Sequence, residues 1–200
     1  MLPSGAPMRR LALVLALSLL TLGCSQTDIA DRGRGLPAMR WDHMPEATDW
    51  TKASLDALSL YGTGLTETVP ADIQTWCPAY EKARPAQRRA FWAGLFSALA
   101  KHESTWNEAA VGGGGRWFGL LQISPATARY HGCAATSGSA LTDGKANLSC
   151  AVRIASSAVV RDGVVAARGR GVAADWGPMT VASKREEIAA WTRAQSYCRG

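Results

Sequence analysis

The sequence predicts a mainly α-helical domain with at most a small β element. Two apolar stripes at helical spacing, within residues 85–103 and 143–160, each predict a core helix. Strand-type residues are concentrated in one short stretch, "WFGLLQI" at 117–123. Hydrophobic residues make up 47% of the 200-residue chain and charged residues 19%, which is enough apolar material for a packed core.

Residues 1–23 have the pattern of an export signal. Arg9 and Arg10 precede an apolar run at 11–22, which is too short to span about 30 Å of hydrocarbon as a helix. The run ends in "TLGC", which resembles a bacterial lipobox with looser matches at its first two positions. We therefore expect lipidation of Cys24 and a membrane anchor through that lipid. An ordinary signal cut nearby, with Cys24 removed or left free, is the alternative.

The export signal sets the expected location and charge. Ser25 follows Cys24, and the absence of Asp there is compatible with outer-membrane sorting, so we expect a periplasmic, lipid-anchored protein. The formal charge of +6 falls to +4 once the two arginines of the signal are removed. No stretch interleaves basic and aromatic residues along one face, so we expect no nucleic-acid partner.

Four cysteines remain beyond Cys24, and an even number in an exported chain predicts two disulfides. Three pairings are possible. We favour Cys133–Cys150, which closes a local loop, and Cys77–Cys198, which joins the two ends of the domain. There is no C-x-x-C pair and the three histidines are scattered, so we expect no metal site and no cofactor.

The polar segment 24–48, rich in Gly, Pro, Arg and Asp, is predicted to be a tether. The domain is expected to span residues 49–200, with a core from about 75 to 200. At its start, residues 49–62 predict a short docked helix, because Trp50, Leu55 and Leu58 recur at helical spacing.

The stripe at 85–103 predicts a core helix whose last turn carries Lys101, His102 and Glu103. A glutamate at a helix C-terminus opposes the macrodipole by about 0.3–1 kcal/mol. The position therefore favours a specific use for the Glu103 carboxylate over a merely solvated charge.

The segment after this helix begins with a glycine run, "VGGGG" at 111–115, which favours a tight turn or a close approach to a ligand. Ser124 then reads as an N-cap with Pro125 at the first helical position. Further helices are predicted at 143–160 and at 184–198. In the last helix Ile188, Trp191 and Ala194 are expected to face inward.

The stretch "HESTWNEAAVGGGGRWFGLLQISPATA" resembles the catalytic core of the soluble lytic transglycosylase family, which has a goose-type lysozyme-like fold. The family's motifs match this chain at Glu103–Ser104, at Asn107 and Ala110, at 119–123 with Leu for Met, and at 125–127. The resemblance is close over these 27 residues and looser over about 110; residues 25–75 lie outside it.

The resemblance implies a lysozyme-like domain that cleaves the β-1,4 bond between N-acetylmuramic acid and N-acetylglucosamine in peptidoglycan. Glu103 would act first as acid and then as base, with a 1,6-anhydromuramoyl product. Glycosidases usually need two carboxylates, and here one stands out. The alternatives are a water-using, lysozyme-type muramidase and a peptidoglycan-binding lipoprotein that lacks turnover.

Five further residues are candidates for contact with the glycan. Gln122 can bond an acetamido group or hydroxyls or, alternatively, brace its own loop, and Trp117 can stack on a sugar face. Ser104 contacts sugar or braces Glu103, and Leu121 is expected to form an apolar wall. Asp175 is a possible second carboxylate.

Two departures from the family pattern bear on these roles. Many members have a serine near the catalytic glutamate where this chain has Gly112. They also have an Ala-Tyr-Asn-Ala-Gly motif where this chain has "AADWG" at 173–177, so that Asp175 or Trp176 stands in place of the tyrosine.

Overall fold

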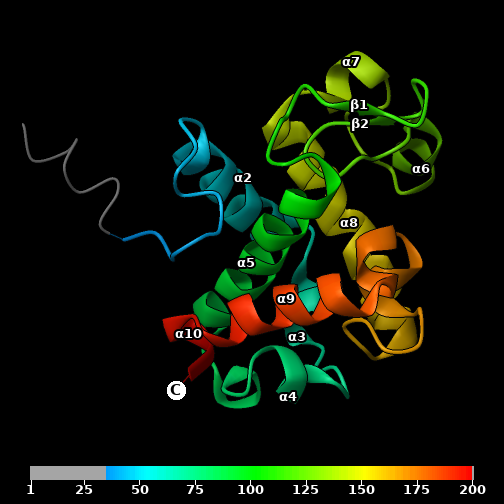
Figure 1. Ribbon diagram of the computed structural model, residues 1–200. Helices are drawn as coiled ribbons and strands as arrows, with labels where there is room; N and C mark the ends of the chain where they lie inside the picture. Colours follow the sequence, from blue (N-terminus) through cyan, green and yellow to red (C-terminus); the bar gives the residue numbers. More distant parts are fainter. Residues whose placement is uncertain (1–34, 200) are drawn as a thin grey trace, which may run out of the picture.

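Helix α5 (Pro85–Glu103) is the central element of the domain, with the other long helices packed around it (Figure 1). Pro85 occupies its first turn, and Gln87 Oε1 accepts a hydrogen bond from the Arg84 backbone N–H at 3.0 Å. All residues from 90 to 100 are buried, so this helix is apolar on every side, as expected for a helix at the centre of a core. The predicted bounds are confirmed.

The structure is a computed structural model that describes residues 35–199. The signal sequence, Cys24 and residues 25–34 of the expected tether lie outside the described residues. The mainly α-helical, lysozyme-like class is confirmed, with one two-stranded sheet in the part of the chain that the structure describes.

Three long helices pack on α5 or on one another: α2 (Ala47–Leu60), α8 (Gly144–Asp162) and α9 (Ala182–Arg193). Helix α2 packs on both α5 and α8, and α9 crosses α5 (Figure 1). The smaller elements are α3 (Thr63–Glu67), α4 (Ile73–Trp76), α6 (Pro125–Tyr130), α7 (Gly138–Leu141), α10 (Ser196–Arg199), β1 (Val111–Gly112), β2 (Trp117–Phe118), and the 3₁₀ helices η1 (Tyr80–Lys82), η2 (Gly171–Ala174) and η3 (Gly177–Thr180).

Helix α8 begins where its sequence supplies a cap. The Asp143 side chain accepts a hydrogen bond from the Ala146 N–H, and Gly163 ends the helix in the left-handed conformation. The apolar stripe predicted for this helix is buried. Ser124 likewise caps α6 by accepting a hydrogen bond from the Thr127 N–H, as predicted.

The single C-terminal helix predicted at 184–198 is two helices, α9 and α10. Ile188 is buried and Trp191 is partly buried, but Ala194 is exposed, so its inward placement was wrong. Ala194 is the C-cap of α9, and the chain turns there. The turn directs Tyr197 and Cys198 into the core.

The described end of the expected tether is packed against the domain. Met39 and Trp41 are buried, and the Trp41 Nε1–H donates to Thr51 Oγ1 at 2.9 Å. The Trp41 and Trp50 rings meet edge to face with centroids 5.7 Å apart. Polar composition predicted a linker here, but two large apolar side chains in a short segment fix it to α2.

Both favoured disulfides are present. Cys77–Cys198 joins residues 121 positions apart with Cα atoms 4.6 Å apart. Cys133–Cys150 ties the segment after α6 to the middle of α8, with Cα atoms 5.2 Å apart. The first bond holds the C-terminal end against the start of the core, and the second holds α6 near α8.

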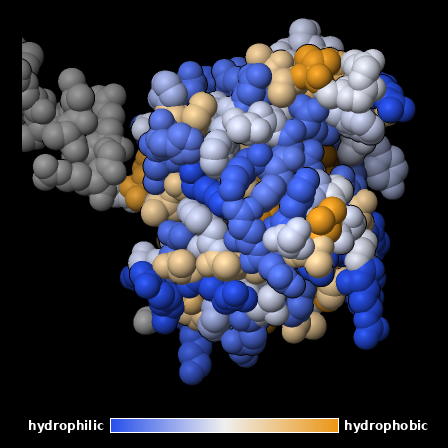
Figure 2. All heavy atoms as spheres, viewed as in Figure 1, coloured by the Kyte–Doolittle hydropathy of each residue, from blue (hydrophilic) through white to orange (hydrophobic). Residues whose placement is uncertain are grey.

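The molecular face in Figure 2 is largely hydrophilic, with small scattered apolar areas. Among residues 35–199, no helix is long and apolar enough to cross a membrane. Within the same range, no three His, Cys, Asp or Glu side chains are grouped so that they could hold a metal ion.

Candidate active site

Glu103 is the last residue of α5, and its carboxyl is partly buried. Burial raises the pKa of Glu103 to about 7, although the positive charge of Lys184 acts in the opposite direction. No hydrogen bond from another described residue contributes to this pKa. The group can therefore hold or release a proton near neutral pH, as a general acid or base requires.

Ser104 joins the end of α5 to the loop that follows β2. Its backbone N–H donates to Ala100 O at 3.0 Å, which closes the helix. Its Oγ–H donates to Leu120 O at 2.9 Å. The structure therefore gives Ser104 the bracing role. Through this hydrogen bond, the residue that follows Glu103 is held to the loop that carries Gln122.

Two residues after Glu103 have left-handed backbone, Thr105 with φ 52° and Trp106 with φ 58°. For non-glycine residues this conformation costs roughly 1–2 kcal/mol each, and such strain gathers at functional sites. The Trp106 indole packs partly buried against the core and donates to Ser97 O at 2.9 Å. The left-handed backbone after Glu103 is thus held in place by the Trp106 side chain, which packs on the core.

The glycine run forms the turn of a hairpin between β1 and β2, in which Gly112 pairs with Trp117. Gly113, Gly114 and Gly115 all have positive φ, which explains the run. The expected strand at 117–123 is limited to its first two residues. Trp117 is 42% exposed at this hairpin, and the Arg116 guanidinium lies 4.7 Å from the centre of its ring.

The Gln122 side chain bonds to its own loop. Its Nε2 donates to Gly119 O at 2.9 Å and to Ala110 O at 3.2 Å. Because both partners are carbonyls, the amide orientation is fixed, and only Oε1 is left to accept a bond from a ligand. Its backbone φ of 46° is again left-handed.

The position of the Gln122 side chain also explains why residue 112 is glycine, where many family members have serine. A Cβ atom at position 112 would collide with Gln122 Oε1. The glycine therefore makes room for the glutamine side chain in this conformation.

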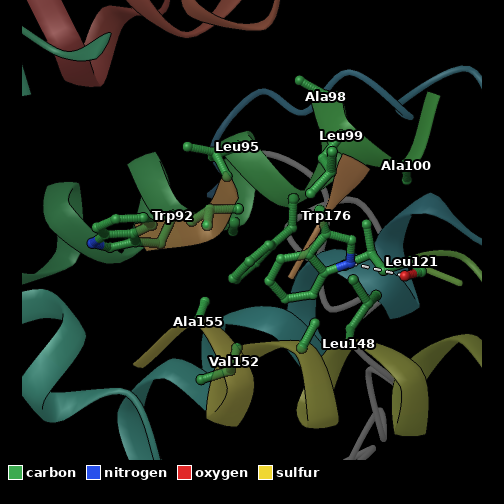
Figure 3. Close-up of a cluster of buried hydrophobic side chains, with 14 of the residues drawn as sticks. Trp92, Leu95, Ala98, Leu99, Ala100, Leu121, Leu148, Val152, Ala155 and Trp176 are labelled. Carbon is green, nitrogen blue, oxygen red and sulfur yellow. Dashed lines mark hydrogen bonds between the residues drawn. The ribbon is translucent and has the colours of Figure 1, made fainter. Parts of the chain in front are cut away.

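Leu121 is fully buried, so its side chain cannot form a wall that substrate touches. It lies instead in the apolar cluster between α5 and α8 (Figure 3). This corrects the expectation from the sequence, which could not distinguish a wall facing substrate from one facing the core.

Asn147 on α8 is a site residue that the sequence reasoning missed. It is fully buried, its Oδ1 accepts from the Leu121 N–H, and its Nδ2 donates to Phe118 O and Leu141 O, each at 2.9 Å. The available signal was an amide next to Leu148 on the buried face of a predicted helix, because a buried amide needs partners.

The two candidate side chains of segment 173–177, Trp176 and Asp175, lie in different surroundings. Trp176 is 3% exposed, and its Nε1–H donates to Leu121 O at 2.9 Å. Asp175 is exposed as a residue, yet desolvation of its carboxyl by the surrounding protein raises its pKa, and the nearby charges are those of His131, Arg161 and Asp162. The charge that acts on Glu103 is that of Lys184. Neither of the two carboxyl groups, Asp175 and Glu103, shifts the pKa of the other.

A cluster of charges joins the last turn of α5 to α9. Glu187 contacts Arg40, Lys101 and His102. Partial burial acts to raise the pKa of Glu187, but hydrogen bonds from Lys101 and Arg40 prevail and lower it to about 2. Burial lowers the pKa of His102 despite the adjacent Glu187. Glu187 thus neutralises Arg40 and Lys101, and Lys101 lies two residues before Glu103.

Comparison with known proteins matches residues 82–161 to the transglycosylase SLT domain. The solved structure of wild-type Bd0314 DslA is 29% identical, with a TM-score of 0.74 over 82% of this chain and 98% of that one. A glutamate-to-glutamine variant of the same protein gives 30% identity and a TM-score of 0.72 over 80% and 97% of the two chains. Among curated proteins, none matches this chain.

Proposed function

This chain belongs to the transglycosylase SLT domain family, and from that premise we propose that it is a lytic transglycosylase. It would cleave the β-1,4 bond between N-acetylmuramic acid and N-acetylglucosamine in peptidoglycan glycan strands. The observation that carries the proposal is the partly buried Glu103, whose pKa of about 7 suits an acid that later acts as a base.

In the first step, protonated Glu103 donates its proton to the glycosidic oxygen as the bond to the muramic anomeric carbon breaks. The substrate's own N-acetyl group assists departure of the leaving sugar. In the second step the muramic C6 hydroxyl attacks the anomeric carbon and gives its proton to the Glu103 carboxylate. The product is a 1,6-anhydro sugar, Glu103 is protonated again, and no water is consumed.

The surroundings of Glu103 favour this route over hydrolysis. A hydrolytic enzyme usually uses a second carboxylate as nucleophile or base. The charged groups around Asp175 are different from the one that acts on Glu103. Glu108 is engaged elsewhere, because its Oε2 accepts from the Trp50 Nε1–H at 2.9 Å and the Gly144 N–H at 3.1 Å.

Two side chains near Glu103 in sequence are suited to hold a glycan strand. Trp117 presents an exposed indole that can stack on a pyranose ring, and Gln122 Oε1 can accept a bond from a sugar N–H or O–H. These two contacts complete a site in which Glu103 performs the proton transfers.

The test is digestion of purified sacculi by wild type, by Glu103→Gln and by Glu67→Gln, with mass spectrometry of the products. Glu67 is an exposed glutamate on α3 and serves as the matched control. We expect 1,6-anhydromuropeptides from wild type and the control, and a loss of about 10²–10⁴-fold in rate for Glu103→Gln. Reducing ends would identify a muramidase, and full activity of Glu103→Gln would refute the role of Glu103. Binding of sacculi without any cleavage would identify a non-catalytic protein.

We further propose lipidation at Cys24 and a periplasmic position at the outer membrane, which would place the enzyme beside its substrate. Incorporation of a labelled fatty acid into the wild-type chain, and its loss in Cys24→Ala, would test the anchor. Membrane fractionation of the two proteins would test the location.

A further inference from the structure

Trp176 lies in the apolar layer between α5 and α8, and Figure 3 shows its indole next to Leu121. It is 3% exposed, and its ring centroid is 6.4 Å from that of Phe96 on α5. It stands between η2 and η3, far along the chain from the hairpin and from Glu103. Only the fold brings it to the loop that precedes α6.

The indole N–H donates to Leu121 O at 2.9 Å, the bond that is drawn dashed in Figure 3. This carbonyl belongs to the peptide bond between Leu121 and Gln122. The Leu121 N–H, on the other side of the same residue, donates to Asn147 Oδ1 at 2.9 Å. Both peptide units around Leu121 are therefore held by side chains from distant elements.

This fixation matters because Gln122 has a φ of 46°, which a non-glycine residue adopts at a cost. Rotation of the peptide between Leu121 and Gln122 would relieve the conformational strain at Gln122, and it would move the Gln122 side chain away from Gly112. The hydrogen bond from Trp176 opposes this rotation, and so preserves the direction of Gln122 Oε1. A buried indole N–H must find an acceptor, and here the acceptor is in the loop that carries a proposed substrate contact.

We propose that Trp176 is a positioning residue for the glycan-cleaving site, which acts through the Leu121–Gln122 peptide. The inference rests on the proposed function. It assigns Trp176 no contact with substrate and no proton transfer. Its contribution is to keep Gln122 in the orientation in which the sugar is held against Glu103, since a displacement of about 1 Å can cost 10²-fold in rate.

The test removes the N–H while keeping an aromatic ring, with Trp176→Phe in the full chain. Trp92→Phe is the matched control, because Trp92 is also fully buried and its Nε1–H donates to Tyr80 Oη at 2.8 Å, away from the loop. kcat and KM are measured on soluble glycan strands, with folding checked by circular dichroism. Each change is made both alone and together with Gln122→Ala.

We expect Trp176→Phe to lower kcat/KM about 10-fold or more, mainly in kcat, and Trp92→Phe to change it less than about 2-fold. The effect of Trp176→Phe should largely vanish in the Gln122→Ala background, because the two residues act as one unit. An unchanged kcat/KM for folded Trp176→Phe, or an equal loss in both backgrounds, would overturn the inference.

If Trp176→Phe does not fold, benzothienylalanine at position 176 keeps the indole shape and lacks only the N–H. The same expectations and the same contrary outcomes apply to that variant. Failure of the proposed function is distinguishable, because wild type itself would then release no glycan fragments. Failure of the inference alone would leave the activity of wild type and the loss of activity in Glu103→Gln as expected.

Discussion

Asn147 Oδ1 accepts a hydrogen bond from the Leu121 N–H, while Asn147 Nδ2 donates to two backbone carbonyls, so one buried amide satisfies three groups of the polypeptide backbone. Asn147→Asp keeps the acceptor but turns a carboxylate oxygen toward Phe118 O and Leu141 O. We expect a loss of about 2–4 kcal/mol in the free energy of unfolding at neutral pH.

Urea denaturation measures this loss, and Asn107→Asp is its control. Asn107 is exposed, and its Oδ1 only accepts a bond from the Ala109 N–H, which an aspartate preserves. Equal stability of the two variants would contradict the bracing role of Asn147.

The pKa of about 7 at Glu103 predicts the pH dependence of cleavage. The first step needs the protonated acid, so kcat/KM should fall about tenfold per pH unit above pH 7. Initial rates on soluble glycan strands between pH 5 and 9 measure this limb. A rate that stays constant to pH 9 would exclude Glu103 as the acid.

Glu103 should also make the native state less stable as pH rises. Its pKa is higher in the folded chain than in the unfolded chain, so ionisation favours unfolding, and the penalty grows from about pH 4.5 and is complete above about pH 7. We therefore expect Glu103→Gln to be more stable than wild type by about 1–3 kcal/mol at pH 8, with almost no difference at pH 4.

Thermal unfolding of both proteins at the two pH values measures this difference. The stability gain and the loss of activity would then come from the same change. A gain that is equal at pH 4 and pH 8 would show that removal of the charge is not its cause.

Trp117→Ala should weaken glycan binding with little effect on folding. The indole is 42% exposed, so its loss removes little core contact, whereas a sugar ring stacked on it would lose about 1–2 kcal/mol, or roughly 5–30-fold in affinity. Binding of Glu103→Gln to glycan strands, with and without Trp117→Ala, is the measurement. Tyr130→Ala, which removes an 85% exposed aromatic residue on α6, is the control and should bind normally.

Glu187→Gln should shift the pH profile without removing activity. Glu187 neutralises Arg40 and Lys101, and Lys101 lies two residues before Glu103. Without it, the uncompensated positive charge favours the Glu103 carboxylate and lowers its pKa, so the alkaline limb of kcat/KM should move to lower pH by less than about 1 unit. Glu186→Gln removes an exposed neighbour, and an identical shift in that variant would refute a local effect.

The helical class, the bounds of α5, the N-cap at Ser124 and the short-range disulfide Cys133–Cys150 followed from local patterns, and Cys77–Cys198 was the pairing left by the even cysteine count. Apolar spacing, caps and loop length depend on residues close in sequence, so they can be read from it. Glu103 also stood out locally, because it ends an apolar helix directly before a glycine run. The described end of the predicted tether, residues 35–48, differs from the prediction because Met39 and Trp41 are buried against residues that composition alone does not reveal.

The sequence by itself thus determined which helices form and which carboxylate ends the central one. The tertiary structure alone decided that Leu121 faces the core, that Asp175 belongs to a different charged cluster, and that Asn147 and Trp176 hold the loop of Gln122. The physical reason is the reach of the interactions. Helices are specified by neighbours within a few turns, whereas a buried hydrogen bond between residues 55 positions apart exists only once packing has brought them together.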